Sequence, residues 1–144
     1  MDDHNTIDIE PVGYLKNDFK DEIPDDYNDK ESIIKIKEEF TERLLGIEKN
    51  SHSTVLMWFD RRDRSIQQVH PMADKENPLT GVFSTRSPVR PNPIAVTVCR
   101  LIRKEGNELT VKGLDGLDGT PVIDIKSYKP YEVSDPKYPD WVPR

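Results

Sequence analysis

Two arginines stand among three prolines in the segment Gly81–Val98, which reads GVFSTRSPVRPNPIAVTV. Each proline fixes its own φ and pushes the preceding residue towards extended geometry. Arg86 and Arg90 therefore lie on a stiff backbone, which has little conformational entropy left to lose when a ligand binds. Because guanidinium groups pair well with carboxylates and phosphates, the segment predicts a site for an anionic ligand. The alternative is that both arginines form structural ion pairs, with partners among Asp60, Asp63 and Asp124.

A second polar segment, Leu114–Lys126, reads LDGLDGTPVIDIK and contains two Leu-Asp-Gly units three residues apart. Glycine adopts positive φ at little cost, so Asp-Gly pairs form turns readily. Exposed amides at such turns can bind a ligand, and the carboxylate of Asp115 or Asp118 can accept hydrogen bonds from a ribose or an amino group. The alternative interpretation is a plain double turn between two strands.

Several common enzyme motifs are absent from the sequence. No Gly-x-Gly-x-x-Gly run follows an expected strand, and there is neither a phosphate-binding loop motif nor a Gly-x-Ser-x-Gly elbow. The common nucleotide-binding folds are therefore disfavoured. The three histidines, His4, His52 and His70, lack the spacing of metal ligands, so we expect no metal site.

The charge is unevenly distributed along the chain, whose net charge is −6. Residues 58–105 carry nine basic and five acidic groups, whereas residues 1–57 carry seven basic and fifteen acidic ones. A basic face can bind nucleic acid even on an acidic protein, with a modest affinity that falls as salt is added. The alternative is a solvated surface with scattered charge.

Length and composition indicate one folded domain over residues 1–144. Apolar residues make up 34% of the chain and fall in discrete runs, as in a globular protein. No run approaches the roughly 20 residues that span a bilayer, and the acidic start Met1-Asp2-Asp3 is unlike the basic start of a signal peptide. We therefore expect a cytoplasmic protein without a membrane partner. The single cysteine, Cys99, lies in the run VTVCRLI and is expected to be a buried, unreactive strand residue.

Short apolar runs with turn residues between them predict a mainly β protein. The run Glu31–Gly46 is typical of a short strand followed by a helix, since Gly46 suits a helix end. Residues Asn17–Lys30 are rich in Asp, Lys and Pro and predict an exposed loop. Six or seven strands with one short helix favour a single small β-barrel. The remaining strands are expected at Ile7–Lys16, as an edge strand, at Ser53–Asp60 with Arg64–His70 as its hairpin partner, and at Gly81–Thr85, Ile94–Arg103, Glu108–Gly113 and Pro121–Tyr128.

The two polar segments together resemble the TsaA-like, or TrmO, family of S-adenosylmethionine-dependent methyltransferases, which N-methylate threonylcarbamoyladenosine beside the tRNA anticodon. The resemblance rests on GVFSTRSPVRPNPI and LDGLDGTPVIDIKSYKP, and the opening VGYLK and the pair Ser51-His52 also match. It covers most of the chain. The resemblance implies a single small β-barrel domain that works as a homodimer, with S-adenosylmethionine bound near the subunit boundary and tRNA as the substrate.

Site residues follow from the resemblance position by position. Arg86 matches the arginine of the family's Thr-Arg-Ser, and Arg90, Asn92 and Pro93 match its Arg-Pro-Asn-Pro. Residues Asp115–Gly119 match the turn that contacts the cofactor. The cofactor-binding set that the resemblance implies is Asp60, Arg61, Arg86, Val96, Asp115, Gly116, Leu117 and Asp118.

The chain departs from the family pattern in three places. After the first strand the family usually has a Pro-Arg-Gln cofactor contact, whereas Lys20–Lys30 reads KDEIPDDYNDK without an equivalent arginine. After the aromatic strand the family commonly has a histidine, where this chain has Asp60-Arg61. Some members carry a C-terminal extension that this chain lacks. These departures leave two further hypotheses: a methyltransferase of the same fold with a protein or small-molecule acceptor, and a non-catalytic barrel that binds the cofactor or RNA.

Methyl transfer to nitrogen requires alignment of the nucleophile with the sulfonium methyl group and removal of a proton. We expect Arg86 to bind the carboxylate of the cofactor or of the substrate's threonyl group, and Arg90 and Arg61 to face the substrate. The general base is left open between Asp60, His70 and the substrate's own carboxylate. The candidate catalytic residues are therefore Asp60, His70 and Arg90.

Overall fold

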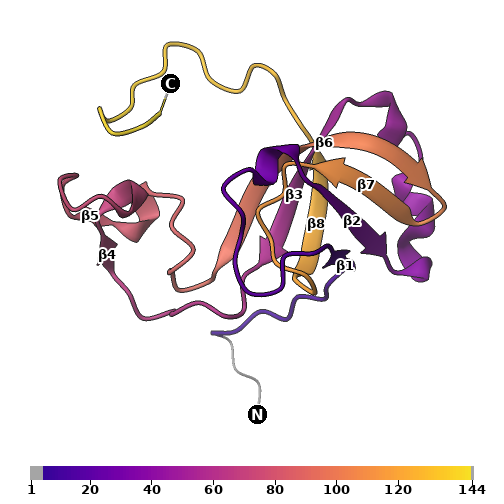
Figure 1. Cartoon of the computed structure of the whole chain (residues 1–144), viewed down its shortest axis with the longest axis horizontal. Helices are drawn as coiled ribbons and strands as arrows, with labels where there is room; N and C mark the ends of the chain where they lie inside the picture. The colour runs from indigo at the N-terminus through magenta and orange to yellow at the C-terminus, as the bar shows by residue number, and fades with distance from the viewer. Residues whose placement is uncertain (1–4, 144) are drawn as a thin grey trace. The chain divides into compact units, whose positions relative to one another are not determined.

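Six strands of the chain close into a barrel in the order β1-β2-β7-β6-β3-β8 (Figure 1). The computed structural model describes residues 5–143, so the expectations for His4 and for Met1-Asp2-Asp3 lie outside the described residues. A mainly β fold built on a small barrel is confirmed. The strands of the barrel are β1 (Gly13–Lys16), β2 (Glu31–Ile36), β3 (His52–Trp58), β6 (Ile94–Glu105), β7 (Glu108–Lys112) and β8 (Pro121–Ser127).

The chain divides into two compact units. Among the described residues, the barrel unit comprises residues 5–58 together with Val96–Tyr128, and the second unit comprises Phe59–Ala95 together with residues 129–143. Each unit has its own internal packing and is described by itself. A single domain over residues 1–144 stays a prediction.

Side chains that alternate along the strands fill the interior of the barrel. In β3, for example, Ser53, Val55 and Met57 are buried and their neighbours are half-buried. Each fully buried aliphatic side chain stabilises the fold by about 1.5–3 kcal/mol relative to an exposed one. The core consists of Leu15, Ile34, Ile36, Val55, Met57, Cys99, Leu109, Val111, Leu114 and Val122.

Cys99 lies on β6 and is buried in this core, as expected from its apolar neighbours. Burial raises the pKa of its thiol to about 12. The thiol therefore stays protonated at neutral pH, and since the thiolate is the reactive form, Cys99 is a structural residue.

Five short 3-10 helices accompany the strands in the described part of the chain. The longest, η2, follows β2 directly, which confirms the predicted order of a strand and then a helix in Glu31–Gly46. Gly46, with φ 86°, turns the chain between η2 and η3. None of these helices has the length and apolar character needed to cross a bilayer. The helices are η1 (Tyr27–Asp29), η2 (Glu38–Leu44), η3 (Ile47–Lys49), η4 (Pro71–Ala73) and η5 (Val82–Ser84).

The second unit contains only short elements among its described residues. β4 (Gln68–Val69) and β5 (Thr80–Gly81) form a two-stranded sheet. The helix η4 lies between these strands in the sequence, and η5 follows β5 directly. Residues 129–143 contain no strand or helix. The proline-rich and arginine-rich segment therefore belongs to a unit held mainly by turns.

The edge strand expected at Ile7–Lys16 was wrong in two respects. Only Gly13–Lys16 forms a strand, and it has β2 on one side and β8 on the other. Pro11 lacks the N–H that a strand needs for a ladder hydrogen bond, so the pairing begins after it. Closure of the barrel removes the edge.

The strands expected at Arg64–His70 and Gly81–Thr85 were also wrong. In the barrel β3 has β6 and β8 as neighbours, and the short β4 pairs with β5 instead of β3. After Gly81 the chain turns into η5, where the N–H and Oγ1 of Thr85 donate to the Val82 carbonyl at 3.1 and 2.9 Å. Hydroxyl side chains that bond to the nearby backbone favour a turn over a strand.

Candidate cofactor site

Asn17, which directly follows β1, holds the β7–β8 loop (residues 113–120) in place. Its Nδ2 donates to the Gly116 carbonyl at 2.9 Å and to Ser32 Oγ at 3.0 Å. Its backbone N–H donates to Asp118 Oδ1 at 3.0 Å. Part-buried hydrogen bonds contribute about 1 kcal/mol each. One residue therefore holds the loop at two points, Gly116 and Asp118, and is itself bonded to Ser32 on β2.

Gly116 places the backbone of the loop directly against the barrel core. A Cβ atom at this position would lie 2.5 Å from Leu15 Cδ1 and 2.9 Å from Met57 Sδ, so a larger residue would displace core side chains. Gly119 has φ 83°, and its N–H donates to the Leu15 carbonyl at 2.9 Å. The loop is therefore a packed part of the barrel rather than a plain double turn.

The backbone amides of the β7–β8 loop fall into two groups. The three N–H groups of Asp118–Thr120 donate to carbonyls of the chain at 2.8 to 3.1 Å. Within residues 5–143, no hydrogen bond from the N–H groups of Asp115–Leu117 is found. Partly buried backbone donors need partners. These three consecutive amides are therefore available to a ligand.

The two carboxylates of the loop are held differently. Asp115 Oδ1 accepts from Thr97 Oγ1 at 2.7 Å, which leaves Oδ2 for another donor. Asp118 accepts from the Asn17 N–H through Oδ1 and forms an ion pair with Lys20 through Oδ2 at 2.8 Å. The hydrogen bond from Lys20 and then the one from Asn17 hold the pKa of Asp118 below the ordinary aspartate value of 3.8. Asp115 is therefore the carboxylate better placed to bind a ligand.

Sequence reasoning missed Asn17 and Lys20, which begin the segment expected only as an exposed loop. Asn17 Oδ1 accepts from the Phe19 N–H at 2.9 Å and so forms an Asx turn. An asparagine directly after a strand is the signal that could have indicated this turn. No local sequence pattern indicates the ion pair of Lys20 with Asp118, because 98 residues separate the two. Their ion pair is exposed and contributes little stability, so its role is to orient the carboxylate.

In the second unit, Arg90 holds the backbone on both sides of Arg86. Its Nη1 donates to the carbonyls of Thr85 and Ser87, both at 3.0 Å. The Ser87 N–H donates to Thr85 Oγ1 at 3.1 Å. Arg86 is therefore carried on a rigid turn. The partners of Arg90 in the described residues are carbonyls, so the alternative ion pair is not formed there. Its expected contact with an anionic ligand stays a prediction.

A cavity of about 890 Å³ opens beside Arg86 in the second unit. His70 lies on its wall, and His70 Nδ1 donates to the Asn77 carbonyl at 2.9 Å. In the neutral ring Nε2 is then the nitrogen with the free lone pair, so His70 can take up a proton there. The apolar lining of the cavity comes from Val69, Pro71, Phe83, Pro88, Trp141 and Val142.

Arg64 ties the segment after β3 to the proline segment. Its Nε donates to the Pro91 carbonyl at 2.6 Å and its Nη2 donates to Asn92 Oδ1 at 3.2 Å. Asp60 and Arg61 precede it and are exposed. Sequence reasoning did not assign Arg64 a role, and no local pattern distinguishes it from the arginines beside it. Its contacts explain how Asn92 is oriented.

The predicted site residues fall into two groups. Asp115–Asp118 lie in one loop of the barrel unit, and Val96 lies on β6 next to Thr97, which contacts Asp115. Within the described residues, no cluster of three or more His, Cys, Asp or Glu side chains is arranged to hold a metal ion. The second unit contains Asp60, Arg61, His70, Arg86 and Arg90.

Residues 17–133 match the family model of the tRNA-methyltransferase O N-terminal domain. The chain belongs to this family. The match includes the β7–β8 loop and the proline segment, which carried the resemblance seen in the sequence, and the predicted family is confirmed.

Two similar proteins and one similar solved structure extend the comparison. The S-adenosyl-L-methionine-binding protein of Archaeoglobus fulgidus is 42% identical over 126 residues, which cover 85% of this chain and 89% of the relative. The tRNA (adenine(37)-N6)-methyltransferase of Mus musculus is 36% identical over 129 residues, which cover 83% of this chain and 30% of the relative. A crystal structure of TrmO from Pseudomonas aeruginosa has a TM-score of 0.73 and 32% identity. That alignment covers 92% of this chain and 61% of the TrmO chain, so this chain spans less than two thirds of the solved protein.

Substitution of Lys20 tests the electrostatics of the loop in this member of the tRNA-methyltransferase O family. Lys20→Gln removes the charged donor of the 2.8 Å contact, and we expect the pKa of Asp118 to rise towards its ordinary value of 3.8. Carbon-13 NMR titration of the carboxyl group measures the change. Lys16→Gln is the matched control, because Lys16 acts on Asp118 only at longer range and is expected to change the pKa less. An equal rise in both variants would contradict the assigned contact.

Proposed function

We propose that the chain is an S-adenosylmethionine-dependent methyltransferase that acts on tRNA. Family membership supports this proposal, as do the names of its relatives: the Archaeoglobus protein is named for S-adenosyl-L-methionine binding and the mouse protein for methylation of adenine 37 in tRNA. The acceptor is threonylcarbamoyladenosine next to the anticodon, which is methylated on nitrogen. Action in the cytoplasm is part of the same proposal.

The hydrogen-bonding groups of the β7–β8 loop are the main structural support for this proposal. S-adenosylmethionine has ribose hydroxyls, an adenine ring, an amino group and a carboxylate, all of which need hydrogen-bond partners. The N–H groups of Asp115–Leu117 are donors and Asp115 Oδ2 is an acceptor, on a loop that Asn17 holds rigid. Because the loop is already ordered, it loses little entropy on binding. When bound, the cofactor supplies an electrophilic methyl group.

In this proposal Arg86 binds a carboxylate, either that of the cofactor or that of the threonyl group. A guanidinium on a rigid turn forms a bidentate pair with little loss of entropy. Arg90 acts as a positioning residue, because its guanidinium holds the carbonyls on both sides of Arg86. Asp60, Arg61 and Val96 complete the proposed cofactor contacts.

Methylation of nitrogen also releases a proton, which a base must take up. His70 fits this role, because its Nδ1–H is bonded to the Asn77 carbonyl and Nε2 keeps its lone pair beside the cavity that Arg86 lines. The exposed Asp60 is the second candidate, and the carboxylate of the substrate is the third. The base would take up the proton that leaves the acceptor nitrogen.

We further propose that the protein is a homodimer that uses the outer face of β6. Val96 and Val98 are 38% and 53% exposed, whereas the next residue, Cys99, is buried in the core. Apolar side chains in a row on a strand surface indicate a face that a partner covers. A second copy of the chain can bring the same strand across a two-fold axis.

A charge on the outer face of β6 tests the dimer. Val98→Asp is expected to give a monomer, because two carboxylates would be buried at the two-fold axis without partners. Size-exclusion chromatography with light scattering measures the mass. Lys104→Asp places the same side chain on the same strand near its end and is expected to leave the dimer intact. A dimer in both variants would show that another surface holds the subunits together.

Methyl transfer from labelled S-adenosylmethionine tests the function itself. Purified protein is expected to label tRNA from a strain that lacks the modification, and mass spectrometry of its nucleosides is expected to show one added methyl group on threonylcarbamoyladenosine. Arg86→Ala is expected to lower kcat/KM about tenfold or more, since hydrogen bonds to charged groups contribute about 1.5–3 kcal/mol. Arg103→Ala is the control, because Arg103 pairs with Glu105 at 2.7 Å on β6.

The same experiment separates the other hypotheses. Label in a protein or small-molecule fraction, with none in tRNA, would show that the methyl acceptor is a protein or a small molecule and not tRNA. Cofactor binding without label in any fraction would identify a non-catalytic barrel. If kcat/KM is unchanged in the Arg86→Ala variant, Arg86 does not take part in the site.

A further inference from the structure

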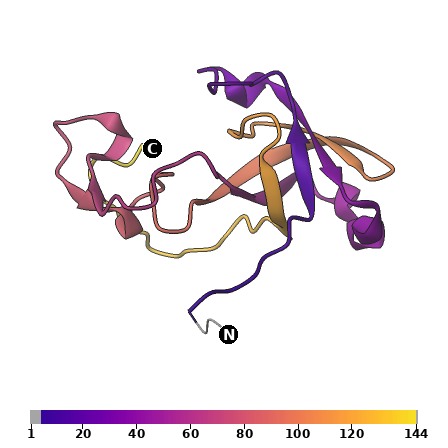
Figure 2. The same cartoon turned by 90° about the horizontal axis from the view of Figure 1, so that it is seen from below.

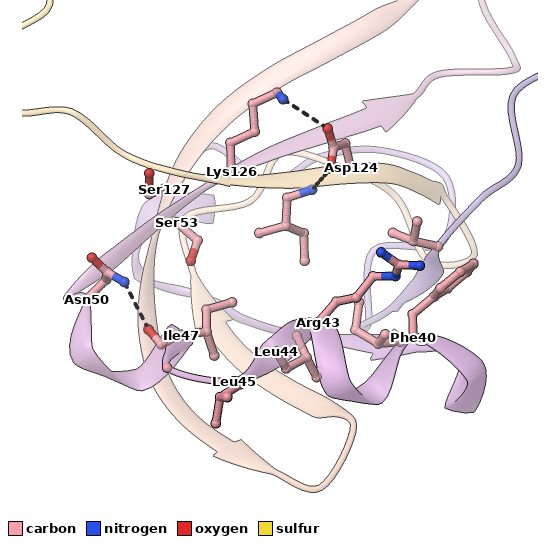
Figure 3. Close-up of a pocket in the computed structure, with 14 residues that line it drawn as sticks. Phe40, Arg43, Leu44, Leu45, Ile47, Asn50, Ser53, Asp124, Lys126 and Ser127 are labelled. Carbon is pink, nitrogen blue, oxygen red and sulfur yellow. Dashed lines mark hydrogen bonds and ion pairs between the residues drawn. The ribbon is translucent and has the colours of Figure 1, made fainter.

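A cavity of about 310 Å³ lies in the barrel unit, at the end opposite the β7–β8 loop (Figure 3). β8 begins just after that loop and ends at Ser127, which pairs with Ser53 near the start of β3. The other wall is the segment of η2 and η3, and Figure 2 shows this segment away from the loop. None of the residues proposed for the cofactor lines this cavity.

The floor of the cavity is apolar. It is formed by Val12, Ile36, Leu44 and Ile47, whereas Leu45 at the rim is 92% exposed. Small-molecule sites have volumes of roughly 300–1,000 Å³. The cavity is at the lower end of that range, so its occupant is a small molecule with an apolar body.

One buried polar group faces this apolar space. Ser53 is only 3% exposed, and Figure 3 shows its hydroxyl directed into the cavity. Within residues 5–143 no hydrogen bond of this hydroxyl is found. Every fully enclosed side-chain polar atom of these residues has a partner, so the Ser53 hydroxyl is not fully enclosed. The hydroxyl therefore meets the cavity, where burial without a hydrogen bond costs free energy. A ligand with an oxygen atom would satisfy it.

The charged groups around the cavity leave one positive charge uncompensated. Lys126 and Asp124 form an ion pair at 3.2 Å and neutralise each other. Arg43 lies over the Phe40 ring, 5.5 Å from its centroid, and forms no ion pair with the described residues (Figure 3). Its planar guanidinium presents donors that match a carboxylate. A single carboxylate would balance this charge, whereas a phosphate dianion would leave one negative charge over.

We propose that this cavity binds a small monocarboxylate with an apolar chain. The chain of the ligand packs on Val12, Ile36, Leu44 and Ile47, and its carboxylate pairs with Arg43. The Ser53 hydroxyl donates to an oxygen of the ligand. This binding site is separate from the proposed methyl transfer and does not depend on it.

Hexanoate and two probes of the same chain length test the proposal. In NMR spectra of assigned amides of the full chain, hexanoate is expected to cause saturable shifts at Ile47, Ser53 and Ile125. Hexan-1-ol and hexylammonium are expected to bind about tenfold more weakly or not at all, because they lack the carboxylate that pairs with Arg43. Equal binding of hexanoate and hexan-1-ol, or no saturable shift with hexanoate, would overturn the proposal.

Arg43→Gln isolates the charge that the proposal depends on. It is expected to weaken hexanoate binding about tenfold while leaving hexan-1-ol unchanged. Lys49→Gln is the matched control, since Lys49 on η3 carries the same charge and does not line the cavity. Unchanged hexanoate binding in Arg43→Gln, or an equal loss in both variants, would overturn the proposal.

Discussion

Closure of the barrel through β1 fixes both the core and the position of the β7–β8 loop. This strand has only four residues, yet it pairs with both β2 and β8. Leu15, in its middle, is buried in the core, and its carbonyl accepts the Gly119 N–H. Closure therefore places the end of β1 against the β7–β8 loop, so that Asn17 can bond to it. The core and the candidate site are fixed by the same short strand.

Hydrogen bonds within each unit hold the β7–β8 loop and the turn around Arg86. In the β7–β8 loop the amides after Leu117 satisfy the fold, while those of Asp115–Leu117 remain for a ligand. In the second unit Arg90 satisfies backbone carbonyls, and Arg86 is the arginine on the turn that it holds. Both segments are therefore rigid. Rigid presentation of this kind reduces the entropy lost on binding.

The sequence predicted those parts of the fold that depend on local pattern. The apolar runs of β3 and around Cys99 correctly indicated strands, and the Asp-Gly pairs indicated the turns of the β7–β8 loop. It failed where long-range pairing decides, since β1 gains its second neighbour from β8, far along the chain. It failed also at Thr85, where hydroxyl hydrogen bonds replace a strand. In the candidate site, the motifs indicated Arg86 and Asp115–Asp118, and these assignments stay predictions. Asn17 and Lys20, which position the β7–β8 loop, were not found because their contacts with Asp118 span about 100 residues.

In the proposed site, barrel closure presents the amides of Asp115–Leu117 to S-adenosylmethionine. Titration of the protein with this cofactor, followed by NMR of assigned backbone amides, tests it most directly. We expect saturable shifts of these three amides, with little change at Gly106 and Asn107 in the turn between β6 and β7. Saturable binding that leaves the Asp115–Leu117 amides unmoved, or no binding, would contradict it.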